Sequence, residues 1–222
     1  MSAKLEIACF NAESALIAEQ GGADRIEFCA NMQVGGTTPS LSDFIELKSK
    51  ISIPVYVMIR PRGGDFVYSD AEFDAMKKSL IQFKEAGADG FVFGILDTNR
   101  KLDITRNKHL LDLADGLPCT FHKAFDEVVE PFIILQQLID LGFENILSSG
   151  QAATAMLGLP ILKQLLQQSE NKINIMVGGS VRSSNIQLLK DELNASWYHS
   201  SAILQGDKAD LEEVRNLKST LI

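Results

Sequence analysis

Short apolar runs, many of them rich in β-branched or aromatic residues, alternate eight times along the chain with longer segments that have a helical pattern. A short continuous apolar run bounded by turn residues indicates a buried strand, and a period near 3.6 indicates a helix. The expected strands are 5–10, 24–29, 55–60, 88–94, 118–122, 144–148, 172–177 and 196–199. The expected helices are 12–20, 41–50, 70–86, 105–115, 131–141, 154–168 with an interruption near Pro160, 184–194 and 209–219.

Residues at several of these boundaries are typical of helix starts and strand ends. Asn11 and Ser69 stand where a side chain can cap the following helix, and either Ser40 or Ser42 can cap the helix near 41–50. Pro61 cannot donate to a sheet ladder, so the third strand is expected to stop there.

Alternating strands and helices predict βαβ units and a parallel sheet. Eight units in a chain of 222 residues fit a single domain, 1–222, folded as a TIM-like (β/α)8 barrel of parallel strands in the α/β class. A doubly wound open sheet is the alternative. The absence of a GxGxxG turn after the first strand counts against it.

Composition narrows the class of protein further. The chain is 45% hydrophobic and 23% charged, and its formal net charge is −8, which is ordinary for a soluble globular protein and argues against a nucleic-acid or anionic-membrane surface. No apolar run approaches the ~20 residues of a membrane span. There is no basic-then-apolar leader, and three widely spaced cysteines suit reduced thiols, so a cytoplasmic location is expected.

The third strand ends in a conspicuous group of polar residues. Arg60 stands at its carboxyl end and is followed by Pro61 and then by Gly63-Gly64. An isolated charge is costly inside a core, so Arg60 is expected to face a cleft, a partner carboxylate or a bound anion.

Polar residues also follow the other strands, and in a TIM-like barrel the carboxyl ends of the strands carry the chemistry. Two of the three histidines, His122 and His199, lie at such ends. If Glu6 and Glu27 point into the barrel, they are natural partners for Arg60 or His122. The candidate catalytic residues are Arg60, His122, Asp126, Glu27 and Glu6, and the candidate anion-binding residues are Arg62, Lys123, Ser149, Gly178, Gly179, His199, Ser200 and Ser201.

The residues after the seventh and eighth strands occupy the usual phosphate corner of this fold. Gly178-Gly179 could present backbone N–H groups to an anion, although a tight turn alone also explains the glycines. His122 could act as a general acid or base near neutral pH. Enolisation, isomerisation and hydrolysis all fit these residue types. The sequence contains no HxH pattern, so it gives no support for a divalent catalytic metal.

Several longer motifs resemble the CutC family of copper homeostasis proteins, from residue 5 to about residue 203. The resemblance implies a TIM-like barrel, a cytoplasmic setting, copper ion binding, copper homeostasis and a homo-oligomer such as a dimer. The motifs are Glu6-Ile7-Ala8-Cys9, Gly22-Ala23-Asp24-Arg25-Ile26-Glu27, Gly35-Gly36-Thr37-Thr38-Pro39-Ser40, Met58-Ile59-Arg60-Pro61-Arg62-Gly63-Gly64-Asp65-Phe66, Thr120-Phe121-His122-Lys123-Ala124-Phe125-Asp126 and Val177-Gly178-Gly179.

The resemblance also implies copper ligands near the ends of the first two strands, which match Cys9 and Cys29. Soft thiolates suit Cu(I), and neighbouring strands lie about 4.8 Å apart, so two sulfurs could share one ion. The alternative is that both cysteines are small buried apolar residues. Cys119 begins the fifth strand, far from the carboxyl ends, and is excluded.

Two functional hypotheses therefore remain open. In the first, the chain binds Cu(I) through Cys9 and Cys29 for copper homeostasis. In the second, it is a barrel enzyme or binder that acts on a small anionic metabolite, such as a phosphorylated one, through Arg60, His122 and Asp126. A third hypothesis, a purely structural interaction protein, is disfavoured by the polar strand ends.

Overall fold

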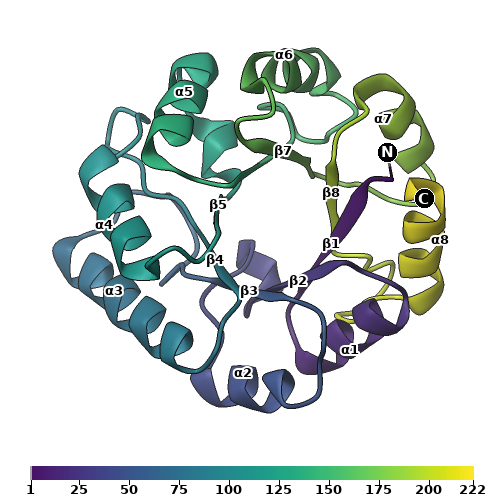
Figure 1. The fold of residues 1–222 in the computed structure, drawn as a ribbon, viewed down its shortest axis with the longest axis horizontal. Coiled ribbons are helices and arrows are strands. Elements are labelled where there is room, and N and C mark those ends of the chain that lie inside the picture. Colours follow the sequence, from purple (N-terminus) through teal and green to yellow (C-terminus); the bar gives the residue numbers. More distant parts are fainter. Residues whose placement is uncertain (1) are drawn as a thin grey trace.

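The eight strands form one closed barrel. The computed structural model describes residues 2–222. The strands follow one another around the barrel in chain order, and β8 returns to pair with β1. Every pairing is parallel, and the helices form an outer ring around the strands (Figure 1). The expected (β/α)8 fold is therefore confirmed, and closure of the sheet excludes the doubly wound alternative.

The elements agree with the pattern of the sequence to within a few residues, except at α6. The strands are β1 (Lys4–Cys9), β2 (Arg25–Phe28), β3 (Val55–Met58), β4 (Gly90–Phe93), β5 (Cys119–Phe121), β6 (Asn145–Ser148), β7 (Asn174–Val177) and β8 (Trp197–Ser200). The helices are α1 (Ala12–Gln20), α2 (Leu41–Lys48), α3 (Asp70–Glu85), α4 (Ile104–Ala114), α5 (Pro131–Leu141), α6 (Leu159–Ser169), α7 (Ile186–Leu193) and α8 (Leu211–Leu221).

Side-chain caps fix the starts of several helices. The side chains of Asn11 and Ser40 accept from the backbone N–H three residues later, at the starts of α1 and α2. Ser69 forms a reciprocal capping box with Glu72 at the start of α3. The expected caps at Asn11 and Ser69 are confirmed, and Ser40 rather than Ser42 caps α2.

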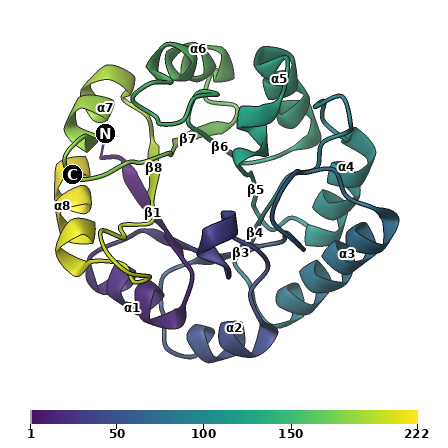
Figure 2. The ribbon, with the colours of Figure 1, turned by 180° about the vertical axis from the view of Figure 1, so that it is seen from behind.

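One local expectation was wrong, and two short segments were not predicted. Helix α6 begins at Leu159, because Pro160 belongs to its first turn and cannot donate an intrahelical bond from an interior position. Two short 3-10 segments were missed, η1 (Met32–Val34) and η2 (Lys123–Glu127). Both follow strand ends, and in Figure 2 the dark purple one-turn segment η1 lies at the inner edge of the ring beside β3.

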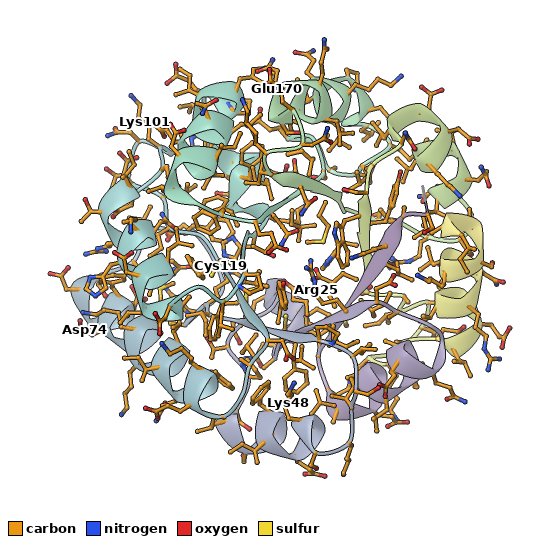
Figure 3. The ribbon with its side chains drawn as sticks, in the orientation of Figure 1. Arg25, Lys48, Asp74, Lys101, Cys119 and Glu170 are labelled. Atoms are coloured by element: carbon orange, nitrogen blue, oxygen red, sulfur yellow. The ribbon has the colours of Figure 1, made fainter. Side chains whose placement is uncertain are left out.

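Strand register decides which side chains share the barrel interior. Glu6 lies opposite Arg25 on β2 and opposite His199 on β8. Successive residues of a strand point to opposite faces, so Glu6, Arg25, Glu27 and His199 all point inward. Figure 3 labels Arg25 close to the middle of the ring of strands. Outward residues such as Ile7 pack against the helices in the main apolar core.

No helix in the part of the chain from residue 2 to residue 222 is both long enough and apolar enough to span a membrane.

Candidate functional site at the carboxyl ends of the strands

A cavity of about 240 Å³ opens where the carboxyl ends of the strands meet. Its walls come from β1, β2, β3, β6 and β8 and from the segments that follow β2, β3, β5, β7 and β8. We call it the mouth cavity. The predicted site residues that line it are Glu27, Cys29, Arg60, His122, Lys123, Gly179, His199, Ser200 and Ser201. The lining does not include the remaining predicted residues, which are Glu6, Cys9, Arg62, Asp126, Ser149 and Gly178.

A buried ionic network forms the floor of the mouth cavity. Arg25 Nε lies 2.5 Å from Glu6 Oε2, and His199 Nδ1 lies 2.8 Å from Glu6 Oε1. His199 Nε2 lies 3.7 Å from Glu27 Oε2. The guanidinium of Arg25 also stacks between Tyr56 and Trp197, 4.1 and 4.0 Å from the ring centroids. The expectation that the two glutamates pair with Arg60 or His122 was wrong, because the register sets Arg25 and His199 beside Glu6 instead.

The network shifts the pKa values of Glu6 and Glu27 in opposite directions. Burial raises the pKa of Glu6, but the charge of Arg25 and the hydrogen bond with His199 outweigh it and lower the pKa overall. Burial, aided by the charge of Glu6, raises the pKa of Glu27 to about 7. Burial lowers the pKa of His199, but the hydrogen bond with Glu6 and the charge of Glu27 raise it above its ordinary value. Of these two glutamates, Glu27 is therefore the one whose raised pKa allows it to gain or lose a proton near neutral pH.

This shift predicts a pH dependence of stability. Between the unfolded pKa of 4.5 and the folded pKa of about 7, the folded chain holds a proton on Glu27 that the unfolded chain has lost. The folded state then binds more protons, so stability falls as pH rises through this window. Glu27→Gln removes the ionisation, and urea unfolding should find the variant more stable than the parent at pH 8, by about 3 kcal/mol, with little difference at pH 4.5. An equal pH dependence in both proteins would contradict the assignment.

Arg60 holds two loops together instead of pairing with an acid. Its Nη1 donates to the carbonyls of Val34 and Gly36, each at 2.8 Å, and its Nη2 donates to the carbonyl of Gly64 at 2.8 Å. The guanidinium carbon lies 4.9 Å from the ring centroid of Phe66. Arg60 thus faces the cavity as expected, but its terminal nitrogens fasten the β2–α2 loop to the β3–α3 loop. Its contribution to the site is to position these walls.

His122 is held as a neutral ring with one defined tautomer. Its Nδ1 accepts from the backbone N–H of Ala124 at 3.2 Å, so the ring proton resides on Nε2. Burial, and then the charge of Arg60, lower the pKa of His122 to about 3. The expectation of a general acid or base that titrates near neutral pH therefore does not match this environment, and His122 is instead a hydrogen-bond donor through Nε2–H.

Asp126 organises the segment after β6. Its carboxylate accepts from Ser148 Oγ at 2.6 Å, from Ser149 Oγ at 2.9 Å, and from the backbone N–H groups of Ser149 and Gln151 at 3.0 Å. Lys123 Nζ lies 3.3 Å from the same carboxylate. With its oxygens occupied in this way, Asp126 acts as a positioning residue for Lys123 and Ser149.

Arg62 lies outside the mouth cavity. Its guanidinium forms ion pairs with Glu72 at 2.5 Å and Asp65 at 2.9 Å, and it donates to the carbonyl of Val67. These contacts lie within the β3–α3 loop and the first turn of α3. The positive charge of Arg62 is thus paired with the neighbouring carboxylates of Asp65 and Glu72.

The corner after β7 and β8 carries an arginine that the sequence reasoning missed. Arg182 lines the mouth cavity, and its guanidinium donates to Ser200 Oγ at 3.0 Å and Ser201 Oγ at 3.3 Å. Gly179 beside it has φ +100°, and a Cβ there would lie 2.6 Å from Ser149 Cβ, so the close approach requires glycine. The sequence did offer one indication of this residue, because Arg182 is a lone cationic side chain three residues after the Gly178-Gly179 turn.

The two cysteines implied as copper ligands point to opposite faces of the sheet. Cys9 lies opposite Phe28 and belongs to the outer apolar core, whereas Cys29 packs in the barrel interior with Met58. Burial, with the charge of Glu27, raises the pKa of both thiols well above the ordinary value, which disfavours thiolates. Among residues 2–222 no group of three or more His, Cys, Asp or Glu side chains is arranged to hold a metal ion. A Cu(I) ion bridged by this pair does not fit the geometry.

Comparison with known proteins places the chain in a family. The CutC family model matches residues 3–204. The chain belongs to the CutC family. A CutC family protein of Photorhabdus laumondii is 47% identical over 90% of this chain and 79% of its own length. The human copper homeostasis protein cutC homolog is 44% identical over 89% of this chain and 72% of its own.

A solved CutC structure shares the fold. The crystal structure of CutC from Streptococcus agalactiae superimposes with a TM-score of 0.86 and 34% identity, covering 90% of this chain and 99% of that one. The expected membership of the CutC family is thus confirmed on both sequence and structure.

Proposed function

We propose that this CutC protein binds a small anionic metabolite, such as a phosphorylated one, in the mouth cavity and acts on it as a barrel enzyme. The observation that carries the proposal is the charge of the lining. Three of the cavity's charged side chains, Arg60, Lys123 and Arg182, are cationic, and Glu27 is the acid among them, in a chain of net charge −8. A cationic pocket in an acidic protein favours an anionic ligand.

Unused hydrogen-bonding capacity supports the same proposal. Within residues 2–222, buried side-chain atoms without a partner include Glu27 Oε1, Arg60 Nε and His122 Nε2, and all three residues line the mouth cavity. Burying a polar atom without a partner costs about 1–3 kcal/mol. Such atoms gathered around one cavity are explained by a ligand that supplies their partners.

Inorganic phosphate is the probe for this proposal. Phosphate at ~100 times its dissociation constant should stabilise the folded protein by about 2.7 kcal/mol, read as a rise in melting temperature. Arg182→Gln should lose most of this rise, because it removes the charge that orients Ser200 and Ser201 toward the corner. Lys123→Met, at a half-exposed position, is the second variant and should weaken the effect without disturbing the fold.

The matched control is Arg215→Gln. Arg215 lies on α8 and pairs with Glu212 on the exposed surface, so this variant changes the net charge equally without touching the cavity. The control should keep the full phosphate effect. Equal protection of the Arg182→Gln variant and the control would move the anion site away from the mouth.

Copper handling is the second candidate, and the name of the human relative favours it. In this case copper would be the cargo of the protein. Since Cys29 lines the mouth cavity and Cys9 faces the outer core, tight Cu(I) uptake should fall in Cys29→Ala and persist in Cys9→Ala. An anaerobic titration against a Cu(I) chelator measures this, with Cys119→Ala as control. Loss of uptake in both Cys9→Ala and Cys29→Ala would restore the two-cysteine hypothesis.

We also propose a cytoplasmic location and a homo-oligomer. The first is supported by three buried cysteines that remain free thiols, and the second rests on the family resemblance. Sedimentation of the purified chain measures the oligomeric state directly.

A further inference from the structure

We infer that the mouth cavity catalyses proton transfer at the carbon next to a carbonyl group, with Glu27 as the base and His122 Nε2–H as the donor to the carbonyl oxygen. The inference rests on the proposed function and names its substrate class, which is a phosphorylated compound with an aldehyde or ketone. Among the reactions open to these residue types, it selects enolisation.

The tautomer of His122 is the first observation. The Ala124 N–H group occupies Nδ1, so the neutral ring carries its proton on Nε2. Nε2 is buried and has no partner among the residues that the structure describes, although the ring lines the mouth cavity. Packing limits the ring's movement, because the ring of Phe66 lies 4.7 Å from it between centroids and the backbone of Gly94 leaves no room for a side chain beside Nδ1. His122 therefore presents a fixed, unused N–H donor to a ligand.

Glu27 supplies the complementary group. Its side chain lines the same cavity and is 4% exposed. Oε2 faces His199 Nε2 at 3.7 Å, and Oε1 has no hydrogen-bond partner within residues 2–222. A buried carboxylate oxygen left free in this way is a positioned proton acceptor. Glu6, fixed by Arg25 and His199, holds His199 in place beneath it.

Together these groups match the requirements of one reaction. Enolisation needs a base for the C–H proton and a neutral donor for the oxygen on which negative charge develops. A carboxylate base combined with a neutral imidazole is an established pairing for abstraction of a proton next to a carbonyl. Hydrolysis would also need a positioned water molecule or a nucleophile. Glu27 and His122 instead supply a base and a hydrogen-bond donor, which are the groups that enolisation needs.

The step balances without a redox partner. Glu27 Oε1 takes the proton from the carbon next to the carbonyl, and the C–H electron pair forms a carbon–carbon double bond. The carbonyl π pair moves to oxygen, where the hydrogen bond from His122 Nε2–H stabilises it. Return of the proton from Glu27 to the same carbon regenerates the substrate. In a substrate whose first carbon bears a hydroxyl group, that hydroxyl proton passes to the former carbonyl oxygen and the proton on Glu27 passes to the former carbonyl carbon. The first carbon then carries the carbonyl group and the former carbonyl carbon carries a hydroxyl group, which is the isomer. Lys123 and the Arg182 corner would hold the phosphate during the step.

Exchange with solvent tests this chemistry before the natural substrate is known. The folded protein in D2O is incubated with a panel of triose, pentose and hexose phosphates in their aldose and ketose forms, and deuterium at the carbon next to the carbonyl is followed by proton NMR. At least one compound should exchange faster than in buffer alone. Glu27→Gln should lower that rate at least ~100-fold, because general base catalysis contributes on this scale. Arg215→Gln should leave it unchanged.

Each outcome decides the inference. Exchange that survives Glu27→Gln, or no exchange with any member of the panel, overturns it. A nitrogen-15 spectrum of His122 gives a second measurement, since Nδ1–H instead of Nε2–H would also overturn it. The proposed function fails separately, when phosphate gives no thermal protection of the parent protein. Phosphate protection of Glu27→Gln shows that the variant is folded and that its loss of exchange is chemical.

Discussion

Glu6→Ala is expected to lower the free energy of unfolding by about 3–5 kcal/mol, the cost of removing one partner of a buried ion pair. Glu6 is 0% exposed and Arg25 is 2% exposed. Without the carboxylate, the guanidinium of Arg25 remains buried among Tyr56, Trp197 and Met176, none of which carries a negative charge. His199 loses its 2.8 Å partner as well. Urea unfolding at pH 7 measures the loss, and the pKa of His199 should fall in the same variant.

Two further variants separate charge from packing. Glu6→Gln keeps the size of the side chain and one acceptor oxygen, so it should cost less than Glu6→Ala. Glu212→Ala breaks an exposed ion pair with Arg215 on α8 and should change stability little. A Glu6→Ala variant as stable as Glu212→Ala would contradict the account of the barrel floor.

Asp126→Ala is expected to destabilise the protein by about 3 kcal/mol, even though Asp126 was predicted as a catalytic residue. The change leaves the backbone N–H groups of Ser149 and Gln151 without their acceptor, and each buried group left unsatisfied costs about 1–3 kcal/mol. It also releases Lys123 from its ion pair at the rim of the cavity. Urea unfolding gives the total loss, and amide hydrogen exchange locates it.

The pattern of amide hydrogen exchange in Asp126→Ala distinguishes a positioning role of Asp126 from a catalytic one. Protection should fall first at Ser149 and Gln151, whose amides bond to Asp126, and remain high in β1 and β2 on the far side of the barrel. Asp126→Asn retains an acceptor oxygen and should preserve much of the stability. If Asp126→Ala left stability and exchange unchanged, the carboxylate would not organise this segment.

Much of the fold could be predicted because its signals are local. Each strand is a short apolar run, and residues such as Asn11 and Ser69 mark helix starts by side-chain chemistry that is independent of the rest of the chain. The error at α6 is also local, because a proline in a helical pattern permits either an interruption or a first turn. The structure chooses the first turn, with Gly158 as the preceding cap residue.

The candidate site was only partly predictable, because its partners are decided by register between strands. The positions of Arg60, His122 and His199 followed from the carboxyl ends of the strands. The pairing of Glu6 with Arg25 required the alignment of β1 with β2, which no local pattern supplies. The same alignment places Cys9 opposite Phe28 and directs it away from Cys29, so two cysteines near neighbouring strand ends do not share one face.

The most direct test of the central claim is a crystal structure of the protein with inorganic phosphate. We expect phosphate in the mouth cavity, within hydrogen-bonding distance of Lys123 and the turn at Gly179, at the corner that Arg182 and Ser201 form. An empty mouth cavity at saturating phosphate, or phosphate bound only to surface lysines, would contradict the claim that this cavity is an anion site.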